Sequence, residues 1–363
     1  MDFLTQLLEF AVKNNASDVH LKADIAPVVR ISRELYDVEM QPLTEDQLCE
    51  LIDGILPKHL REAYGKFREA DFSYRLADLA RFRVNVFQQR GRMAMVMRNV
   101  KNKIPTFQDI NVPVESMKKI AEKHRGIILL VGTTGSGKST TLAAMLNYIN
   151  SNYRRHIVTL EDPIEYVFAD VKSVIEQREI GLDTPDFNTA LKRVLRQDPD
   201  IIMIGEMRDA ESLMAAISAA DTGHLVLSTL HCSNSAASVG RILDFFPQED
   251  RDMVRTQFAS AFQAVVSQRL CPAISGGVVP AVEIMLNTPS VRKLIEENRL
   301  EKLPNAISAG QEDGMQTFNQ ALYKLIKSRM VTEKDALERA TNRQALEMNL
   351  KGIFLSEDKG ILG

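Results

Sequence analysis

The chain has 363 residues, of which 45 are Lys or Arg and 48 are Asp or Glu, and its formal net charge is −3. With 45% hydrophobic and 26% charged residues, its composition is close to globular averages, which excludes a disordered or fibrous chain and favours roughly two domains. A slightly acidic balance also argues against a sequence-independent nucleic-acid binder, because such proteins carry an excess of basic residues to displace counterions.

Targeting and redox features predict a cytoplasmic protein. The opening MDFLTQLLEF lacks a basic segment before its apolar residues, and no run approaches the roughly 20 apolar residues that cross a bilayer. The three cysteines, Cys49, Cys232 and Cys271, are far apart and suit neither a disulfide framework nor a zinc knuckle. We therefore expect a protein that is peripheral to a membrane at most.

The first hundred residues have the pattern of a small mixed domain. Helical spacing or strand alternation occurs at residues 3–13, 28–31, 44–55 and 72–76. The clearest signal is RFRVNVF at residues 81–87, where apolar and polar residues alternate, and AMVMRNV at residues 94–100 returns after a turn. A β-hairpin is predicted there, within an α+β domain over residues 1–100.

A polar segment with Pro105 predicts a linker over residues 101–112. Beyond it, the apolar runs GIILLVG, HIVTLED, DIIMIGE and HLVLSTL alternate with helical segments. Continuous apolar strands of this kind are typical of a parallel sheet covered on both faces. The predicted fold is therefore α/β over residues 113–290, with a helical C-terminal segment over residues 291–363.

The motif GTTGSGKS at residues 132–139 fits the phosphate-binding pattern GxxxxGK[ST] and lies between an expected strand and an expected helix. In such loops the backbone N–H groups converge on phosphate oxygens, Lys138 reaches the outer phosphates, and the Ser139 hydroxyl binds Mg²⁺. The sequence thus predicts ATP and Mg²⁺ as ligands. The predicted nucleotide-binding residues are Gly132, Thr133, Thr134, Gly135, Ser136, Gly137, Lys138, Ser139 and Thr140.

Carboxylates follow two of the expected strands. Glu206 ends the run DIIMIGE, where it would contact the Mg²⁺ shell or position water beside the phosphate loop. Glu161, Asp162 and Glu165 follow HIVTL, and they would polarise the attacking water; the alternative is a solvated acidic loop.

Two histidines border the run LVLSTL. His224 precedes it and His231 follows it, and a neutral imidazole at a strand end can sense a phosphate through a hydrogen bond. A structural histidine with no part in the chemistry is an equally good interpretation of either position.

These four elements, in this order and spacing, resemble the secretion ATPase superfamily (GspE/PulE-like), and more narrowly the PilT/PilU-type ATPases of the type IV pilus. The resemblance is carried by ASDVHLKADIAPVVRI, RFRVNVF, VGTTGSGKSTTLAAM, HIVTLEDPIEYVF, QREIGLDT, LRQDPDIIMIGEMRDAES, TGHLVLSTLH and GMQTFNQAL. It implies a PAS-like N-terminal domain, a RecA-like P-loop ATPase domain and a ring of six subunits. It also makes Glu206 the Walker B carboxylate and Glu161 the water-activating one, supported by Asp162 and Glu165, with both histidines in the His box.

In this family, arginines compensate the phosphate charge between the two domains and a neighbouring subunit. The resemblance assigns five candidates to this task, namely Arg81, Arg83, Arg98, Arg193 and Arg196. Because Arg81 and Arg83 alternate with apolar residues, the alternative of a merely solvated hairpin face remains open.

The subclass implied is the retraction ATPase, because the sequence has no tetracysteine zinc element of the kind common in assembly and type II secretion ATPases. The resemblance implies docking on a platform protein at the cytoplasmic face of the inner membrane. The segment SVRKLIEE at residues 290–297 departs from the AIRNLIRE pattern of PilT-type motors, while QRLCPA and VEIMLNTP are PilU-like. An accessory PilU-like retraction ATPase, a pilus extension or secretion ATPase, and a RecA-like nucleic-acid translocase are the alternatives.

Overall fold

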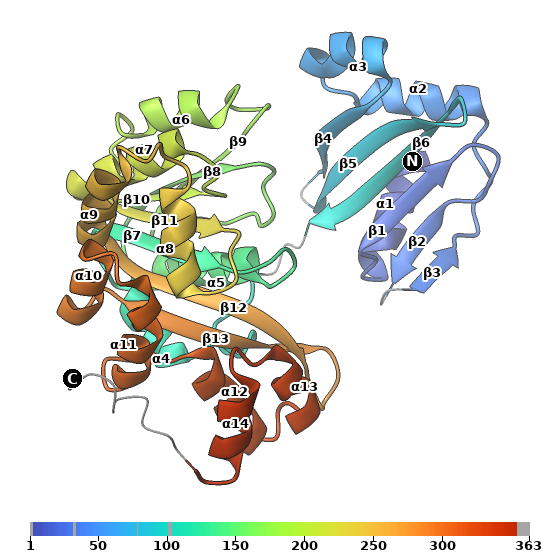
Figure 1. Ribbon diagram of the computed structural model, residues 1–363. Helices are drawn as coiled ribbons and strands as arrows, with labels where there is room; N and C mark the ends of the chain where they lie inside the picture. The colour runs from blue at the N-terminus through green and yellow to red at the C-terminus, as the bar shows by residue number, and fades with distance from the viewer. Residues whose placement is uncertain (1–2, 32–33, 78, 101–103, 354–363) are drawn as a thin grey trace. The chain divides into compact units, whose positions relative to one another are not determined.

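The computed structural model describes residues 3–31, 34–77, 79–100 and 104–353. The chain forms two compact units (Figure 1). The first contains the described residues up to 100 together with residues 165–167, and the second contains the other described residues from 104 onward. Parts of the predicted linker (101–103) and of the predicted C-terminal segment (354–363) lie outside the described residues. The predicted domain boundaries stay predictions.

The first unit is a six-stranded antiparallel sheet in the order β3-β2-β1-β6-β5-β4. Its strands are β1 (Asp18–Lys22), β2 (Val28–Ile31), β3 (Glu34–Asp37), β4 (Ala70–Leu76), β5 (Ala80–Gln89) and β6 (Arg92–Val100). Its helices are α1 (Phe3–Lys13), α2 (Glu45–Ile55), the 3-10 turn η1 (Lys58–Leu60) and α3 (Arg61–Phe67). The predicted hairpin is β5 and β6, with Phe82 and Val84 buried in the core against the helices.

The second unit is a seven-stranded sheet in the order β13-β12-β7-β11-β10-β8-β9. Its strands are β7 (Gly126–Val131), β8 (His156–Glu161), β9 (Val174–Glu179), β10 (Ile201–Ile204), β11 (Leu225–Leu230), β12 (Phe262–Pro272) and β13 (Val278–Leu286). The four apolar runs form β7, β8, β10 and β11, and their neighbours pair in parallel, as predicted. Only β13 among the described strands of this sheet runs antiparallel to its neighbour.

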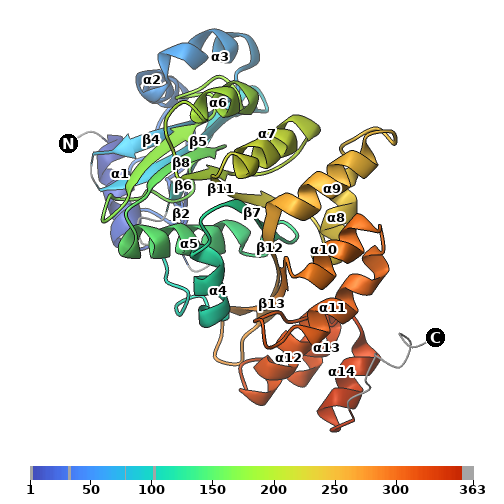
Figure 2. The ribbon, with the colours of Figure 1, turned by 90° about the vertical axis from the view of Figure 1, so that its left-hand side faces the viewer.

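Helices cover both faces of this sheet. They are α4 (Val114–Ala121), α5 (Lys138–Asn152), α6 (Phe187–Val194), α7 (Ala210–Asp221), α8 (Ser235–Leu243), α9 (Arg251–Ala261), α10 (Pro289–Glu296) and α11 (Leu303–Ala309). One core joins α4 and α5 to the sheet, and the other joins α6 to α11 to its opposite face (Figure 2). Because both faces are buried, every residue of β7 and β11 is buried, which explains why these strands are apolar without alternation.

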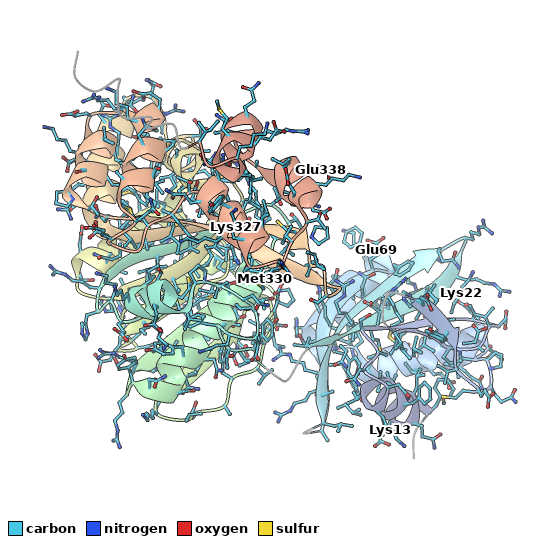
Figure 3. The ribbon with its side chains drawn as sticks, turned by 90° about the horizontal axis from the view of Figure 1, so that it is seen from below. Lys13, Lys22, Glu69, Lys327, Met330 and Glu338 are labelled. Atoms are coloured by element: carbon cyan, nitrogen blue, oxygen red, sulfur yellow. The ribbon has the colours of Figure 1, made fainter. Side chains whose placement is uncertain are left out.

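Three further helices, α12 (Phe318–Lys327), α13 (Glu333–Arg339) and α14 (Arg343–Leu350), pack against the β12–β13 hairpin around Cys271 and Ala281. Lys327 and Glu338 on these helices are exposed, as are Lys13 and Lys22 in the first unit (Figure 3). None of the helices among the described residues is long and apolar enough to cross a bilayer.

Candidate active site

The phosphate-loop motif forms the connection between β7 and α5, as predicted from the flanking patterns. Lys138 is the first residue of α5 and is only 7% exposed. Its Nζ donates hydrogen bonds to the carbonyl oxygens of Gly132 and Thr133, at 2.8 Å and 3.0 Å. The ammonium group is therefore held inside the curve of the loop.

The loop has the properties of an anion site. The N-cap residue of α5 is Gly137, with φ of 90°, and among the described residues no side chain caps the helix there. Ser136 Oγ is buried and has no hydrogen-bond partner within the described part of the chain. A Cβ on Gly132 would lie 2.3 Å from that oxygen, so only glycine permits this approach. Uncapped N–H groups at the positive end of a helix suit a phosphate.

The strands that border this loop end at the same edge of the sheet. Leu129 of β7 pairs with Ser228 of β11, Ser228 pairs with Ile204 of β10, and Ile204 pairs with Leu160 of β8. Strands β7, β8 and β11 continue past this row toward the edge that carries the phosphate loop, whereas β10 ends at Ile204. Glu161 is the last residue of β8, Glu206 follows β10 by two residues, and His231 directly follows β11, so all three lie at this edge.

Glu206 interacts with two basic side chains. Arg208 Nε donates to its Oε2 at 2.8 Å, and His231 Nε2 lies 3.5 Å from its Oε1. The hydrogen bond to Glu206 raises the pKa of Arg208, although burial opposes this effect. Close approach of β10 to β8 depends on Gly205, because a Cβ there would lie 3.2 Å from the carbonyl oxygen of Leu160.

Glu161 differs from the other carboxylates of its cluster. It is buried, at 6% exposure, and its Oε1 accepts hydrogen bonds from Thr159 Oγ1 at 2.6 Å and from Gln177 Nε2 at 3.0 Å. Asp162 and Glu165 are exposed. Within the residues that the structure describes, no three His, Cys, Asp or Glu side chains form a group that could hold a metal ion.

The comparisons with known proteins agree with this geometry. Residues 68–276 match the family model described as "Type II/IV secretion system protein". The type IV pilus retraction ATPase PilT of Pseudomonas aeruginosa is 42% identical over 93% of this chain and 98% of its own. The chain belongs to the type II/IV secretion protein family.

Two further relatives within this family cover nearly the full chain. The type IV pilus ATPase PilU of Pseudomonas aeruginosa is 38% identical over 95% of this chain and 91% of its own. A crystal structure of the pilus retraction motor PilT with bound ADP has a TM-score of 0.88 at 39% identity, covering 96% of this chain and 99% of that one. The predicted fold class is confirmed: an α/β, RecA-like P-loop ATPase unit, a smaller N-terminal α+β PAS-like unit and C-terminal helices.

The two histidines predicted to form a His box lie at opposite ends of β11. His224 precedes the strand, and its backbone carbonyl accepts a hydrogen bond from Gly126 at the start of β7. Its Nδ1 lies 2.9 Å from the carbonyl oxygen of Ala219. The structure therefore brings His231 together with Glu206 and places His224 at the edge of the sheet away from the phosphate loop.

Three candidate arginines of this secretion ATPase lie on the hairpin of the first unit. Arg83 pairs directly with Arg98 across β5 and β6, and Arg98 pairs with Asp18 of β1. Arg98 Nε donates to Asp18 Oδ1 at 2.9 Å. Arg83 is exposed and Arg81 is half-buried on the same face of the strand. Arg98 is thus tied to a buried carboxylate, whereas Arg83 reaches solvent.

The other two candidates lie near the end of α6. Arg193 is in its last turn, Arg196 follows the helix, and both are exposed. This helix packs against α7 and the sheet through Ala190, Leu191 and Val194, which is the face opposite the arginines.

Sequence reasoning missed three residues that contact the site. Arg208 lay within the motif GEMRDAES, and its spacing of two residues from Glu206 was an available signal. Gln177 and Gln268 begin the motifs QREIGLDT and QRLCPA, but their contacts form only when β9 pairs with β8 and β12 pairs with β7, so the local sequence does not specify those contacts. Gln268 Nε2 donates to Thr141 Oγ1 of α5 at 2.9 Å in the buried interior.

Proposed function

We propose that this chain is an ATP-hydrolysing motor that powers type IV pilus retraction, and hence twitching motility. The observation that carries the proposal is the convergence of the phosphate loop, Glu206 and His231 on one edge of the sheet, in a chain similar over nearly its full length to a pilus retraction motor. The chemistry is cleavage of ATP by water to ADP and phosphate.

Binding begins at the phosphate loop. The N–H groups at the start of α5 and the hydroxyl of Ser136 donate to phosphate oxygens, as glycine-rich loops before helices do. Lys138 exchanges its hydrogen bonds to the Gly132 and Thr133 carbonyls for stronger ones to charged phosphate oxygens. The Lys138 side chain is therefore preorganised within the loop before the nucleotide binds.

Mg²⁺, when bound, neutralises phosphate charge and orients the phosphate oxygens. Ser139, in the first turn of α5, and Glu206, at the end of β10, are the residues that hold it, the latter through bound water. One or two carboxylates beside substrate phosphates are the usual protein contribution to a Mg²⁺ site.

Glu161 accepts the proton of the attacking water. Its carboxylate is oriented by Thr159 and Gln177, and burial keeps solvent from competing for it. Asp162 and Glu165 are exposed and shape the acidic loop around it. His231 links Glu206 to the end of β11 and reports phosphate occupancy through that contact, whereas His224 stabilises the far end of the strand.

Arginines supply the remaining positive charge in a ring of six subunits. Arg83 is the leading candidate to act on a neighbouring subunit's nucleotide because it is exposed, with Arg81 and Arg98 beside it; Arg193 and Arg196 form a second exposed pair. The ring docks on a pilus platform protein at the cytoplasmic face of the inner membrane, and no nucleic acid takes part.

One observation favours an accessory retraction ATPase as a second candidate. Helix α10 contains most of SVRKLIEE, the segment that departs from the AIRNLIRE pattern. The helix buries Val291 and Ile295 and exposes Lys293 and Glu296. The departures from the PilT-type pattern therefore lie on its solvent face, where they alter contacts with other molecules rather than the core. Pilus extension or protein secretion by the same chemistry, and a nucleic-acid translocase, are the remaining alternatives.

Two variants test the ATPase. Lys138→Ala should abolish ATP turnover, and wild-type activity in this variant would overturn the proposal. Glu206→Gln should retain ATP binding but strongly lower the rate of phosphate release, because the Mg²⁺ site loses its carboxylate. Lys192→Ala, which removes an exposed ion pair with Glu211, is the matched control and should behave as wild type.

Genetic complementation separates the biological alternatives. Restored twitching in a retraction-deficient strain by this chain alone supports the principal motor, and restoration only together with a PilT-type motor supports the accessory ATPase. Loss of surface pili on deletion supports extension instead. Stimulation of ATPase activity by single-stranded DNA would indicate a translocase.

A further inference from the structure

Residues 231–235, here called the sensor loop, connect β11 to α8 and are anchored at three points. His231 Nε2 lies 3.5 Å from Glu206 Oε1 at the start of the loop. In the middle, the Ser233 carbonyl oxygen accepts a hydrogen bond from a terminal nitrogen of Arg269 at 3.2 Å. At the end, the Ser235 N–H donates to Glu283 Oε1 at 2.9 Å.

Arg269, on β12, joins the sensor loop to the C-terminal helices. Its other terminal nitrogen donates to the carbonyl oxygen of Arg339, the last residue of α13, at 2.8 Å, and to Thr341 Oγ1 at 3.0 Å. The guanidinium stacks 3.8 Å from the ring centroid of Phe318, the first residue of α12. A planar fork that binds carbonyls on both sides and stacks on an aromatic ring is a geometry that Lys cannot reproduce.

Glu283 fixes the same junction from β13. Burial raises the pKa of its carboxyl, while hydrogen bonds from the Ser235 backbone and hydroxyl, the charge of Arg269, and the Phe318 N–H counteract this effect. Ser235 is the first residue of α8, so this buried carboxylate binds the first N–H of the helix that follows the sensor loop, while Asn234 is its N-cap. Glu283 and Phe318 also line the same pocket, so the end of the sensor loop lies beside the start of α12.

The strand that carries Arg269 also contacts the phosphate-loop region. Gln268 precedes Arg269 and, because side chains alternate along a strand, points to the other face. There it donates to Thr141 of α5, three residues after Lys138. Strand β12 thus lies between the nucleotide-binding helix and the C-terminal helices.

The packing beside this junction leaves room for movement. A cavity of about 800 Å³ borders it, with Asn234, Glu283, Phe318 and Thr341 among its lining residues. The pocket is partly open to solvent, and residues of α11, α12 and α14 line it, so these helices are not close-packed against one another at this point.

We propose that Arg269 is a positioning residue that couples the sensor loop to helices α12–α14, so that displacement of these helices changes the contact between His231 and Glu206 and thereby the rate of ATP hydrolysis. The coupling runs in both directions, because interaction free energies between sites are reciprocal. This inference rests on the proposed function, since it assigns a regulator to the same catalytic carboxylate.

A simpler role for Arg269 is to attach α13 and α14 to the sheet. That role predicts a loss of stability on substitution, without a specific effect on the sensor loop. Kinetics and hydrogen exchange distinguish the two, because only coupling requires that Arg269 and His231 act on hydrolysis as a unit.

The test compares Arg269→Gln with Arg269→Lys in the full chain. We expect Arg269→Gln to lower kcat by about 2- to 30-fold while the KM for ATP changes less than about twofold, and Arg269→Lys to restore little of this loss. Amides of the sensor loop should exchange faster in both variants. Arg61→Gln, which changes an exposed arginine of α3 that donates to the Asp53 carbonyl oxygen, is the matched control and should resemble wild type.

A double-mutant cycle with His231→Ala completes the test. If Arg269 acts through His231, the Arg269→Gln/His231→Ala variant should have the kcat of His231→Ala alone. Additive losses in kcat, or unchanged sensor-loop exchange in Arg269→Gln, would overturn the coupling. Failure of the proposed ATPase function is recognised separately. If that function is wrong, Lys138→Ala will leave ATP turnover unchanged. Hydrogen exchange of the sensor loop tests the coupling by itself, because it does not depend on ATP turnover.

Discussion

Arg208 binds Glu206 through two nitrogen atoms that both approach the same carboxylate oxygen. Nε and a terminal nitrogen of Arg208 each lie 2.8 Å from Glu206 Oε2. The arginine side chain is 60% exposed and the glutamate side chain 22%. The carboxylate that we propose for the Mg²⁺ shell is therefore engaged by a guanidinium that solvent can readily reach, and we expect the two cations to compete for it.

Removal of Arg208 should strengthen the response to magnesium. In Arg208→Gln, the Mg²⁺ concentration that gives half-maximal ATPase activity should fall by about 1.4- to 5-fold, the range expected for a solvent-exposed ion pair. The measurement is a magnesium titration at fixed ATP. Lys192→Ala removes a comparable exposed ion pair at a distance from Glu206 and should leave the titration unchanged. A higher magnesium requirement in Arg208→Gln would mean that Arg208 orients Glu206 rather than competing with the metal.

Gly205 should tolerate a side chain poorly. An added Cβ would lie 3.2 Å from the Leu160 carbonyl oxygen, so the backbone of β8 must move by a few tenths of an ångström beside Glu161. We expect Gly205→Ala to lower the free energy of unfolding by about 1–3 kcal/mol and to reduce ATPase activity, because Glu206 and Glu161 both move. Denaturant unfolding and steady-state kinetics provide the measurements.

Gly240, within α8, is the matched control for that substitution. A Cβ there meets nothing within 4 Å, so Gly240→Ala should stabilise the protein by about 0.5–1 kcal/mol through helix propensity. An equal decrease in the free energy of unfolding in Gly205→Ala and Gly240→Ala would show that crowding at Gly205 does not cause the destabilisation.

The sequence predicted those parts of the fold whose signal is local. Strands β7 and β11 are buried on both faces and therefore read as continuous apolar runs, and β5 is recognisable because Phe82 and Val84 alternate with arginines. Strand β9 escaped prediction because it is the edge of the sheet, where half-exposed polar residues such as Glu176 and Gln177 resemble a loop.

The site was predictable only where residues follow apolar runs. Glu206 and Glu161 could be placed at one edge because parallel strands share their carboxyl ends. The same reasoning separates His231 from His224, since only the former follows its strand. The contacts of Arg269 and Gln268 depend on β12 pairing with β7, which lies more than a hundred residues earlier, and no local pattern specifies that pairing.

Removing one partner of the buried hydrogen bond between Gln268 and Thr141 should lower the free energy of unfolding more than removing both partners. Gln268→Leu leaves the Thr141 hydroxyl without its donor in the interior and should destabilise the protein by about 1–3 kcal/mol. Gln268 Oε1 is itself buried without a partner within the described residues, so the Gln268→Leu/Thr141→Val pair should be close to wild type in stability. Urea unfolding of both variants checks this, and additive destabilisation would contradict it.

Asp18 should make the first unit sensitive to acid. Burial alone would raise the pKa of its carboxyl, but hydrogen bonds from Arg98 and Ser17 outweigh this effect and bring the pKa below the ordinary value of 3.8. A carboxyl with a lowered folded-state pKa stabilises the protein fully above the unfolded-state pKa, and this contribution is lost as the pH falls through the folded-state value. The stability difference between wild type and Asp18→Asn should therefore be constant near neutral pH and shrink below about pH 5, as urea unfolding between about pH 7 and pH 3 would show. Asp24→Asn removes an exposed partner of Arg92 and should track wild type across this range, whereas a difference for Asp18→Asn that grows on acidification would reverse the assigned sign.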